Sequence, residues 1–161
     1  MNIRVGMGFD VHPLEEGRPL YLGGIQLVDA PKGAVGHSDA DVLIHALCDA
    51  LLGAAGLRDI GFHFSNQDPR WKGKDSKYFL EEVTHMLQEK GWTIGNIDCT
   101  LCLERPKINP HIPAMQKALA PLMGIEEECV SIKATTNEKL GFIGREEGVT
   151  AYAVALISKD K

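Results

Sequence analysis

The stretch HSDADVLIHALCDALLGAAG, residues 37–56, sets the expectation for the fold. Apolar residues recur through it at helical spacing, which predicts an amphipathic helix with one buried face. Ser38 or Asp39 is a candidate N-cap, and Gly56 is a candidate stop. The sequence on both sides supplies strands against which such a helix can pack.

Four strands, two further helices and a hairpin are expected around this helix. Strands are predicted at residues 2–10, 93–104, 129–136 and 149–158, helices at 75–91 and 109–124, and a hairpin at 19–28 that turns at Gly23-Gly24. Asn109 is the candidate N-cap of the third helix, and residues 61–75 and 137–148 are expected to be loops. The order predicts an α+β fold: a single domain over residues 1–161, with helices on one face of a mixed four-stranded sheet plus the small hairpin.

The composition is that of an ordinary soluble globular protein. Of its 161 residues, 44% are hydrophobic and 24% charged, and the net charge of −5 argues against nucleic acid or an anionic membrane as a partner. The first residues, MNIRVGMGFDVH, lack the apolar segment of a signal peptide, and no apolar run approaches the roughly 18 residues of a membrane span. We therefore expect a cytoplasmic location.

Cysteine spacing raises the question of a zinc or redox site. Cys99 and Cys102 form a CxxC pair, but the pair lies in a predicted strand and no second CxxC exists. With Cys48 and Cys129, they are expected to be free, mostly buried thiols in a reducing compartment.

The stretch GFDVHPL, residues 8–14, carries the first candidate metal ligands. In a strand, Asp10 and His12 point to the same face, and His45 lies in a helix able to pack against that face. Two imidazoles and one carboxylate leave a coordination position open, which is typical of a catalytic site for zinc, iron(II) or manganese. The alternative for His45 is a core histidine with one hydrogen bond. Asp41 and Asp49, one helical turn from His45 on either side, are candidate partners of its second nitrogen; otherwise they are a capping charge and a solvated residue.

Three further stretches suit anions. His37 and Ser38 precede the first helix, where backbone N–H groups can bind phosphate, although from these residues alone a plain capping segment is the favoured explanation. Lys107 precedes the third helix, and Thr135, Thr136 and Glu138 follow a strand, where Glu138 could bind Mg²⁺. The glycines that follow fit neither a Walker loop nor a dinucleotide fingerprint.

Four stretches together resemble one family: GFDVH (8–12), GHSDADVLIHALCDALLGAAGLRDIG (36–61), PKINPHIPAM (106–115) and KATTNEKLGFIGREEG (133–148). They resemble the 2-C-methyl-D-erythritol 2,4-cyclodiphosphate synthases of the methylerythritol phosphate route to isoprenoids, in order and over essentially the whole chain. The resemblance implies a cyclase acting on 4-diphosphocytidyl-2-C-methyl-D-erythritol 2-phosphate. In that reaction the 2-phosphate attacks the β-phosphorus, CMP leaves, and an eight-membered cyclic diphosphate forms.

The resemblance also implies a role for each matching residue. Zn²⁺ or Mn²⁺ would be held by Asp10, His12 and His45, and a second ion, Mg²⁺ or Mn²⁺, would lie between the substrate phosphates near Glu138. His37 and Thr136 would stabilise the transition state. Substrate-binding residues would be Asp10, Val11, His12, His37, Ser38, Asp59, Ile60, Gly61, Phe64, Ser65, Asn66, Gln67, Asp68, Leu103, Lys107, Ile108, Asn109, Thr135, Thr136, Asn137, Glu138, Phe142 and Arg145.

Family members are homotrimers around a threefold axis, with active sites at subunit interfaces. The resemblance therefore implies a trimer whose axial cavity, near Phe142 and Arg145, can take an isoprenoid diphosphate. The chain departs from the family at Ser65, Asn66 and Gln67, and at Leu103 and Asn137, but not at the metal triad. A bacterial cytoplasm is expected, with a processed plastid enzyme as the alternative.

Two other functions stay open at this stage. Two histidines and a carboxylate could form the iron(II) site of an oxygenase, although the ligand order and the absence of a second predicted sheet do not favour it. A non-catalytic trimer that only carries isoprenoid diphosphates is the second alternative.

Overall fold

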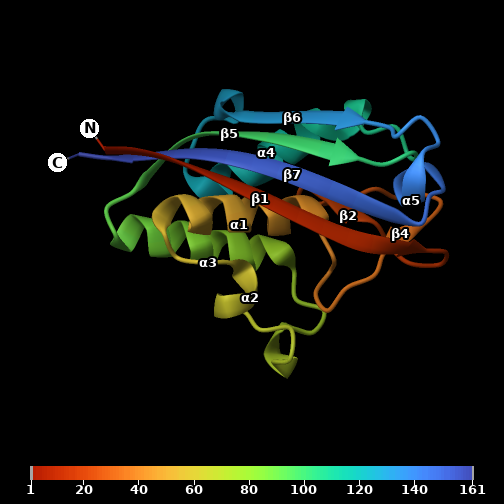
Figure 1. The fold of residues 1–161 in the computed structure, drawn as a ribbon, viewed down its shortest axis with the longest axis horizontal. Helices are drawn as coiled ribbons and strands as arrows, with labels where there is room; N and C mark the ends of the chain where they lie inside the picture. The colour runs from red at the N-terminus through yellow and green to blue at the C-terminus, as the bar shows by residue number, and fades with distance from the viewer. Residues whose placement is uncertain (1, 161) are drawn as a thin grey trace.

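A mixed sheet with the strand order β4-β1-β7-β5-β6 forms the centre of the computed structural model (Figure 1), which describes residues 2–160. The strands are β1 (Asn2–Glu15), β4 (Gly33–Ala34), β5 (Thr93–Cys102), β6 (Val130–Thr135) and β7 (Gly148–Lys159). β7 pairs antiparallel with both β1 and β5, and β5 pairs parallel with β6. The expected α+β class with a mixed sheet is confirmed.

Three long helices lie on one face of this sheet: α1 (Val42–Ala55), α3 (Ser76–Glu89) and α4 (Ile112–Met123). α1 packs on β1 and β7, α4 packs on β6, and α3 packs against both helices. The hairpin of β2 (Tyr21–Leu22) and β3 (Ile25–Gln26) turns at Gly23 and Gly24, both with positive φ, as predicted. No helix within residues 2–160 is long and apolar enough to cross a membrane.

Several predicted boundaries and the strand count are wrong. The sheet has five strands rather than four, because Gly33 and Ala34 pair with the end of β1. β1 runs to Glu15 instead of ending at residue 10, since β7 offers it an unbroken partner. The expected loops contain two short helices, α2 (Ile60–His63) and α5 (Gly141–Gly144), and a 3-10 turn at Pro69–Trp71. Such single turns leave no periodic signal in the sequence.

Two predicted helix caps are also wrong. The N-cap of α1 is Asp41, not Ser38 or Asp39, and its fully buried carboxylate accepts hydrogen bonds from the N–H groups of Leu43 and Ile44. The same carboxylate accepts from Gly23 and Gly24, so it also fastens the hairpin to the start of α1. Burial raises the pKa of Asp41, although hydrogen bonds from the N–H groups of Gly24, Ile44 and Gly23 oppose that rise.

Asn109 is not a cap because residues Asn109–His111 form a 3-10 turn ahead of α4. The α-helix then begins at Ile112 without a side-chain cap. The N-cap of α3 is Asp75, whose side chain accepts a hydrogen bond from the N–H of Lys77.

The inner face of β1 is built for close approach of α1. Gly6 and Gly8 point toward the helix, and a Cβ atom at either position would overlap the backbone oxygen of Ala50 or Ala46. Asp10 and His12 continue the same face beyond the two glycines. The missing side chains therefore let α1 lie close enough to bring His45 to these two residues.

The outer face of the sheet is apolar and uncovered over β1 and β7, whereas β5 and β6 carry the exposed ion pair of Asp98 and Lys133 on that side. β1 and β7 expose large side chains on the side opposite the helices, at Ile3, Val5, Met7, Phe9, Val11, Tyr152 and Val154. Met7 and Val5 are 65% and 64% exposed. We call this set the outer apolar face. Contiguous apolar surface of this kind is typical of an interaction site.

Candidate metal centre and active site

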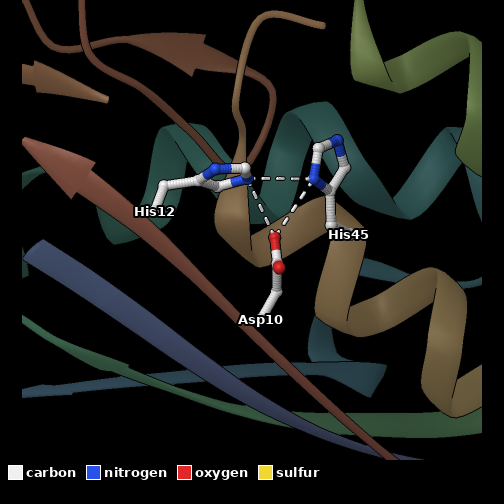
Figure 2. Close-up of side chains that lie close together, drawn as sticks. All are labelled: Asp10, His12 and His45. Atoms are coloured by element: carbon white, nitrogen blue, oxygen red, sulfur yellow. Dashed lines mark hydrogen bonds and ion pairs between the residues drawn. The ribbon is translucent and has the colours of Figure 1, made fainter. Parts of the chain in front are cut away.

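Asp10, His12 and His45 bring three ligand atoms together at the end of the β1–α1 contact. Figure 2 shows both imidazole rings turned toward the Asp10 carboxylate, His12 from β1 and His45 from α1. Asp10 Oδ2 lies 3.0 Å from His12 Nε2 and 3.1 Å from His45 Nδ1, and the two nitrogens are 3.2 Å apart. Among the described residues, this is the group of histidine, cysteine and acidic side chains with the spacing of a metal site.

The spacing fits one tetrahedral metal ion. Zinc bonds nitrogen and oxygen at about 2.0 Å, so two tetrahedral ligands lie about 3.3 Å apart, close to the three observed separations. Three protein ligands leave a fourth position open toward the adjoining pocket. The residues present therefore fit a divalent metal such as zinc.

A backbone contact sets which nitrogen of His12 faces the site. His12 Nδ1 lies 3.0 Å from the carbonyl oxygen of Val35, and a carbonyl can only accept a hydrogen bond. Nδ1 therefore carries the hydrogen, and Nε2 can present its lone pair to a metal.

Electrostatics at the triad favour charge separation. Burial alone would raise the pKa of Asp10, but its hydrogen bonds to His12 and His45 and their charges hold that pKa well below its usual range. For His12, burial lowers the pKa, and the Asp10 hydrogen bond and charge outweigh it and raise the pKa. The Asp10 carboxylate is thus ionised and ready to bind a cation.

A pocket of about 440 Å³ opens beside the triad. Its lining includes nine residues predicted from the sequence: Asp10, His12, His37, Ser38, His45, Ile60, Gly61, Phe64 and Asn66. The prediction missed three lining residues, Gly36, Trp71 and Phe79. Phe64, Trp71 and Phe79 pack together with ring centroids 5.0 to 5.8 Å apart and form an apolar wall. The aromatic content of residues 61–75 was the available signal for this wall.

A second pocket, of about 120 Å³, lies between the ends of β5 and β6. Its lining includes six predicted residues, Leu103, Lys107, Ile108, Asn109, Thr135 and Thr136, and shares none with the triad pocket. β1 and β5 are separated in the sheet by β7. A single chain therefore does not bring the metal triad and these six predicted substrate-binding residues into one cavity.

The loop after β6 is held by a glutamate that the sequence did not single out. Glu104 Oε1 accepts hydrogen bonds from the backbone N–H groups of Asn137 at 2.8 Å and Lys139 at 3.3 Å. Glu138 and Lys139 both have positive φ, and Glu138 Oε1 accepts from Thr136 Oγ1 at 3.3 Å. The loop thereby groups the Thr136 hydroxyl and the Glu138 carboxylate on one exposed ridge.

Other predicted residues lie outside both pockets. Those on the far side of the triad or in surrounding loops are Val11, Asp59, Ser65, Gln67, Asp68, Asn137, Glu138, Phe142 and Arg145. Val11 lies on the outer apolar face, so only its backbone faces toward the triad side of β1. Asp59 caps α2, and the Asp68 carbonyl oxygen lies 3.1 Å from His37 Nε2.

The predicted partners of the second His45 nitrogen are wrong. Asp41 is occupied by four backbone N–H groups, and Asp49 accepts from the N–H of Ile60 at 2.7 Å. His45 Nε2 instead lies 2.9 Å from Ser76 Oγ and 3.1 Å from Ser38 Oγ. Helical spacing pointed to residues on α1, whereas the partners come from the loop before α1 and from α3.

A model of the YgbB family matches residues 3–158. The chain belongs to the YgbB family. It is 67% identical over 159 residues to the 2-C-methyl-D-erythritol 2,4-cyclodiphosphate synthase of Cytophaga hutchinsonii, covering 99% of both chains. It is 59% identical over 160 residues to the synthase of Bacteroides thetaiotaomicron, covering 99% of this chain and 100% of that one.

The fold agrees with this family membership. A solved structure of 2C-methyl-D-erythritol-2,4-cyclodiphosphate synthase, in a form with bound CDP, matches with a TM-score of 0.88 and 42% identity. The match covers 96% of this chain and 100% of that one. The resemblance inferred from four separate motifs is therefore confirmed over nearly the whole chain.

Proposed function

We propose that this YgbB-family chain is a phosphorus–oxygen lyase that converts 4-diphosphocytidyl-2-C-methyl-D-erythritol 2-phosphate to 2-C-methyl-D-erythritol 2,4-cyclodiphosphate and releases CMP. The observation that carries the proposal is the convergence of Asp10, His12 and His45 beside an open pocket, in a chain 67% identical to a relative that bears this name. The whole chain, residues 1–161, would act as one catalytic domain in the cytoplasm of a bacterium.

The residues suit an intramolecular attack of one phosphate on another. Such a reaction needs no protein nucleophile, because the attacking oxygen belongs to the substrate. It needs neutralised charge and an in-line arrangement, which cations and fixed hydrogen-bond donors supply. His37 and Ser38 line the triad pocket and would bind the attacking phosphate or the β-phosphate. The apolar wall would exclude water from the reacting atoms.

Two divalent ions would share the negative charge of the substrate. Asp10, His12 and His45 would hold Zn²⁺ or Mn²⁺, which supplies Lewis-acid polarisation of a phosphate oxygen when bound. Glu138, grouped with Thr136 on the ridge after β6, would support Mg²⁺ or Mn²⁺ between the α- and β-phosphates. Thr136 and His37 would stabilise charge in the transition state.

The cytidine moiety would bind in the second pocket, against Leu103, Ile108 and Asn109, with Lys107 toward the phosphates. Residues Asp59–Gly61 and Phe64–Asp68 would surround the methylerythritol hydroxyls. Because the two pockets of one chain are separate, the nucleotide pocket that completes each metal pocket would come from a neighbouring subunit.

The outer apolar face supports this assembly. A homotrimer around a threefold axis would bury Val5, Met7 and their neighbours on β1 and β7, which a lone chain leaves exposed. Phe142 and Arg145 would then lie near the axial cavity, where an isoprenoid diphosphate could bind.

Release of CMP by the purified protein tests the proposal. With Mg²⁺ and trace Zn²⁺, we expect CMP and a cyclic diphosphate, detected by chromatography and ³¹P NMR. Asp10→Ala and His45→Ala should each lower the turnover number by more than about 100-fold while leaving the circular dichroism spectrum unchanged, because each removes a metal ligand. No CMP from a folded, zinc-loaded protein would contradict the proposal and favour a non-catalytic isoprenoid-diphosphate carrier.

A further inference from the structure

We propose that Ser76 and Asp39 form a hydrogen-bond relay that positions His45 for metal binding by fixing which ring nitrogen carries its hydrogen. The inference deepens the proposed function, because it rests on His45 being a metal ligand. Neither residue lines the triad pocket.

The relay is continuous in the structure. His45 Nε2 lies 2.9 Å from Ser76 Oγ, and Ser76 Oγ is in turn hydrogen-bonded to Asp39 Oδ1. Asp39 Oδ2 also accepts a hydrogen bond of 2.9 Å from the backbone N–H of Ser76, so the Asp39 carboxylate makes two hydrogen bonds to Ser76. Ser76 is fully buried.

The donors and acceptors available along the relay determine the direction of each hydrogen bond. A carboxylate oxygen has no hydrogen to give, so the single hydrogen of the Ser76 hydroxyl points to Asp39. The Ser76 oxygen can then only accept from His45, which places the ring hydrogen on Nε2. His45 Nδ1, the atom that faces Asp10 and His12, is left with a free lone pair.

This direction completes the case for a cation at the triad. His12 is oriented by Val35 so that its Nε2 lone pair faces inward, and the relay does the same for His45 Nδ1. With the Asp10 carboxylate, three acceptors then converge within 3.2 Å of one another. When both rings are neutral, no hydrogen lies between these three atoms, so a shared positive charge is the arrangement that satisfies all three.

The relay also gives Ser38 and Ser76 different roles. Ser38 Oγ lies 3.1 Å from His45 Nε2 and accepts the N–H of Ala40 at 3.3 Å, but unlike Ser76 it lines the pocket. Because Ser76 takes the ring hydrogen of His45, the Ser38 hydroxyl is left to donate to a phosphate oxygen. Asp39 further ties the two loops together, since its backbone N–H donates to the carbonyl of Lys74 just before α3.

The first test measures the imidazole nitrogens of the metal-free, full-length protein by ¹⁵N NMR, at a pH where the His45 ring is neutral. We expect His45 to carry its hydrogen on Nε2. Asp39→Asn should reverse the relay, because an amide NH₂ would donate to Ser76 Oγ and turn the serine hydrogen toward His45. In that variant we expect the hydrogen of His45 on Nδ1. A hydrogen on Nδ1 in the unmodified protein would overturn the proposal, whether or not metal binds.

The second test measures Zn²⁺ affinity by competition with a chromophoric chelator. Ser76→Ala should raise the zinc Kd by about 10- to 100-fold, and Asp39→Asn by at least as much. Thr84→Val is the matched control, because Thr84 lies on the same helix with a buried hydroxyl that has no partner. An unchanged zinc Kd in folded Ser76→Ala and Asp39→Asn would overturn the proposal. If no variant and no parent protein binds zinc, the proposed function fails while the NMR result still decides the relay.

Discussion

Polar side chains occupy a face of β1 that a core strand would fill with aliphatic residues. Asp10 and His12 follow Gly6 and Gly8 on that face. The two glycines allow close packing against α1, and the next two residues on the same face are candidate metal ligands. Burial of a carboxylate costs free energy, and here the cost is offset because His12 and His45 lower the pKa of Asp10. We therefore interpret the triad as a cation-binding site rather than as a structural ion pair.

The buried thiol of Cys99 makes the free energy of unfolding depend on pH. Burial raises the pKa of Cys99 from 9.0 to about 12, so this thiol stays neutral in the folded chain while it ionises in the unfolded chain above pH 9.0. Stability is therefore complete below pH 9 and falls between pH 9 and pH 12, by up to about 1.4 kcal/mol per pH unit for this thiol. Denaturant titrations of the parent protein and of Cys99→Ala should differ in slope over this window. Equal slopes for the parent protein and Cys99→Ala would contradict this account.

The triad could be predicted from the sequence because of where its three residues stand in the expected elements. The spacing of Asp10 and His12 in a strand, and the helical place of His45, were enough to expect them on facing surfaces. The role of Ser76 could not be predicted in the same way, because it depends on where α3 begins relative to α1. Asp41 was misjudged for the same reason: its partners Gly23 and Gly24 come from a distant hairpin.

At the scale of elements, the contact between α1 and β1 positions the site. Gly6 and Gly8 let the helix approach the strand, and Asp41 fixes where the helix begins. The helix, the long strands and the hairpin were predicted from periodicity and turn residues, whereas the short helices α2 and α5 were not. These single turns are held by tertiary contacts, such as the Asp49 bond to Ile60, that no local pattern encodes.

Gly8→Ala tests this close approach. The added Cβ would overlap the backbone oxygen of Ala46, so we expect a loss of at least about 2 kcal/mol in the free energy of unfolding, with weaker zinc binding as His45 moves from Asp10. Gly53→Ala is the control on α1, because a Cβ there meets no atom within 4 Å. It should stabilise the protein by up to about 1 kcal/mol through helix propensity. A Gly8→Ala variant as stable as its parent would refute the packing argument.

At the scale of the whole molecule, the sheet has one face covered by helices and one face left bare. β1 and β7 carry the outer apolar face, and the two pockets lie apart within one chain. If copies of the chain pack through the outer apolar faces of their sheets, the exposed apolar side chains become buried. The metal pocket of one copy can then meet the nucleotide pocket of another. Most residues that line each pocket could be predicted from the sequence, but the separation of the two pockets follows from strand order, which periodicity does not reveal.

Val5→Asp tests the role of the outer apolar face. A charge at this 64% exposed position should prevent a dry interface and yield monomers, measured by sedimentation velocity. Val28→Asp is the control, because Val28 is 88% exposed and lies outside the sheet. It should sediment as the parent does. If Val5→Asp keeps the parent's oligomeric state, the interface lies elsewhere.

Subunit mixing tests the central claim, that each active site joins the metal pocket of one subunit to the nucleotide pocket of another. His45→Ala destroys the first pocket and Thr136→Ala impairs the second, so each variant alone should release CMP at less than about 1% of the parent rate. Co-refolding equal amounts would form mixed trimers. The intact metal pocket of a Thr136→Ala subunit would then meet the intact nucleotide pocket of a His45→Ala subunit in about a quarter of the sites, restoring about a quarter of the parent activity. Mixed oligomers that stay as inactive as the separate variants would place both pockets of each site in one chain and contradict the account.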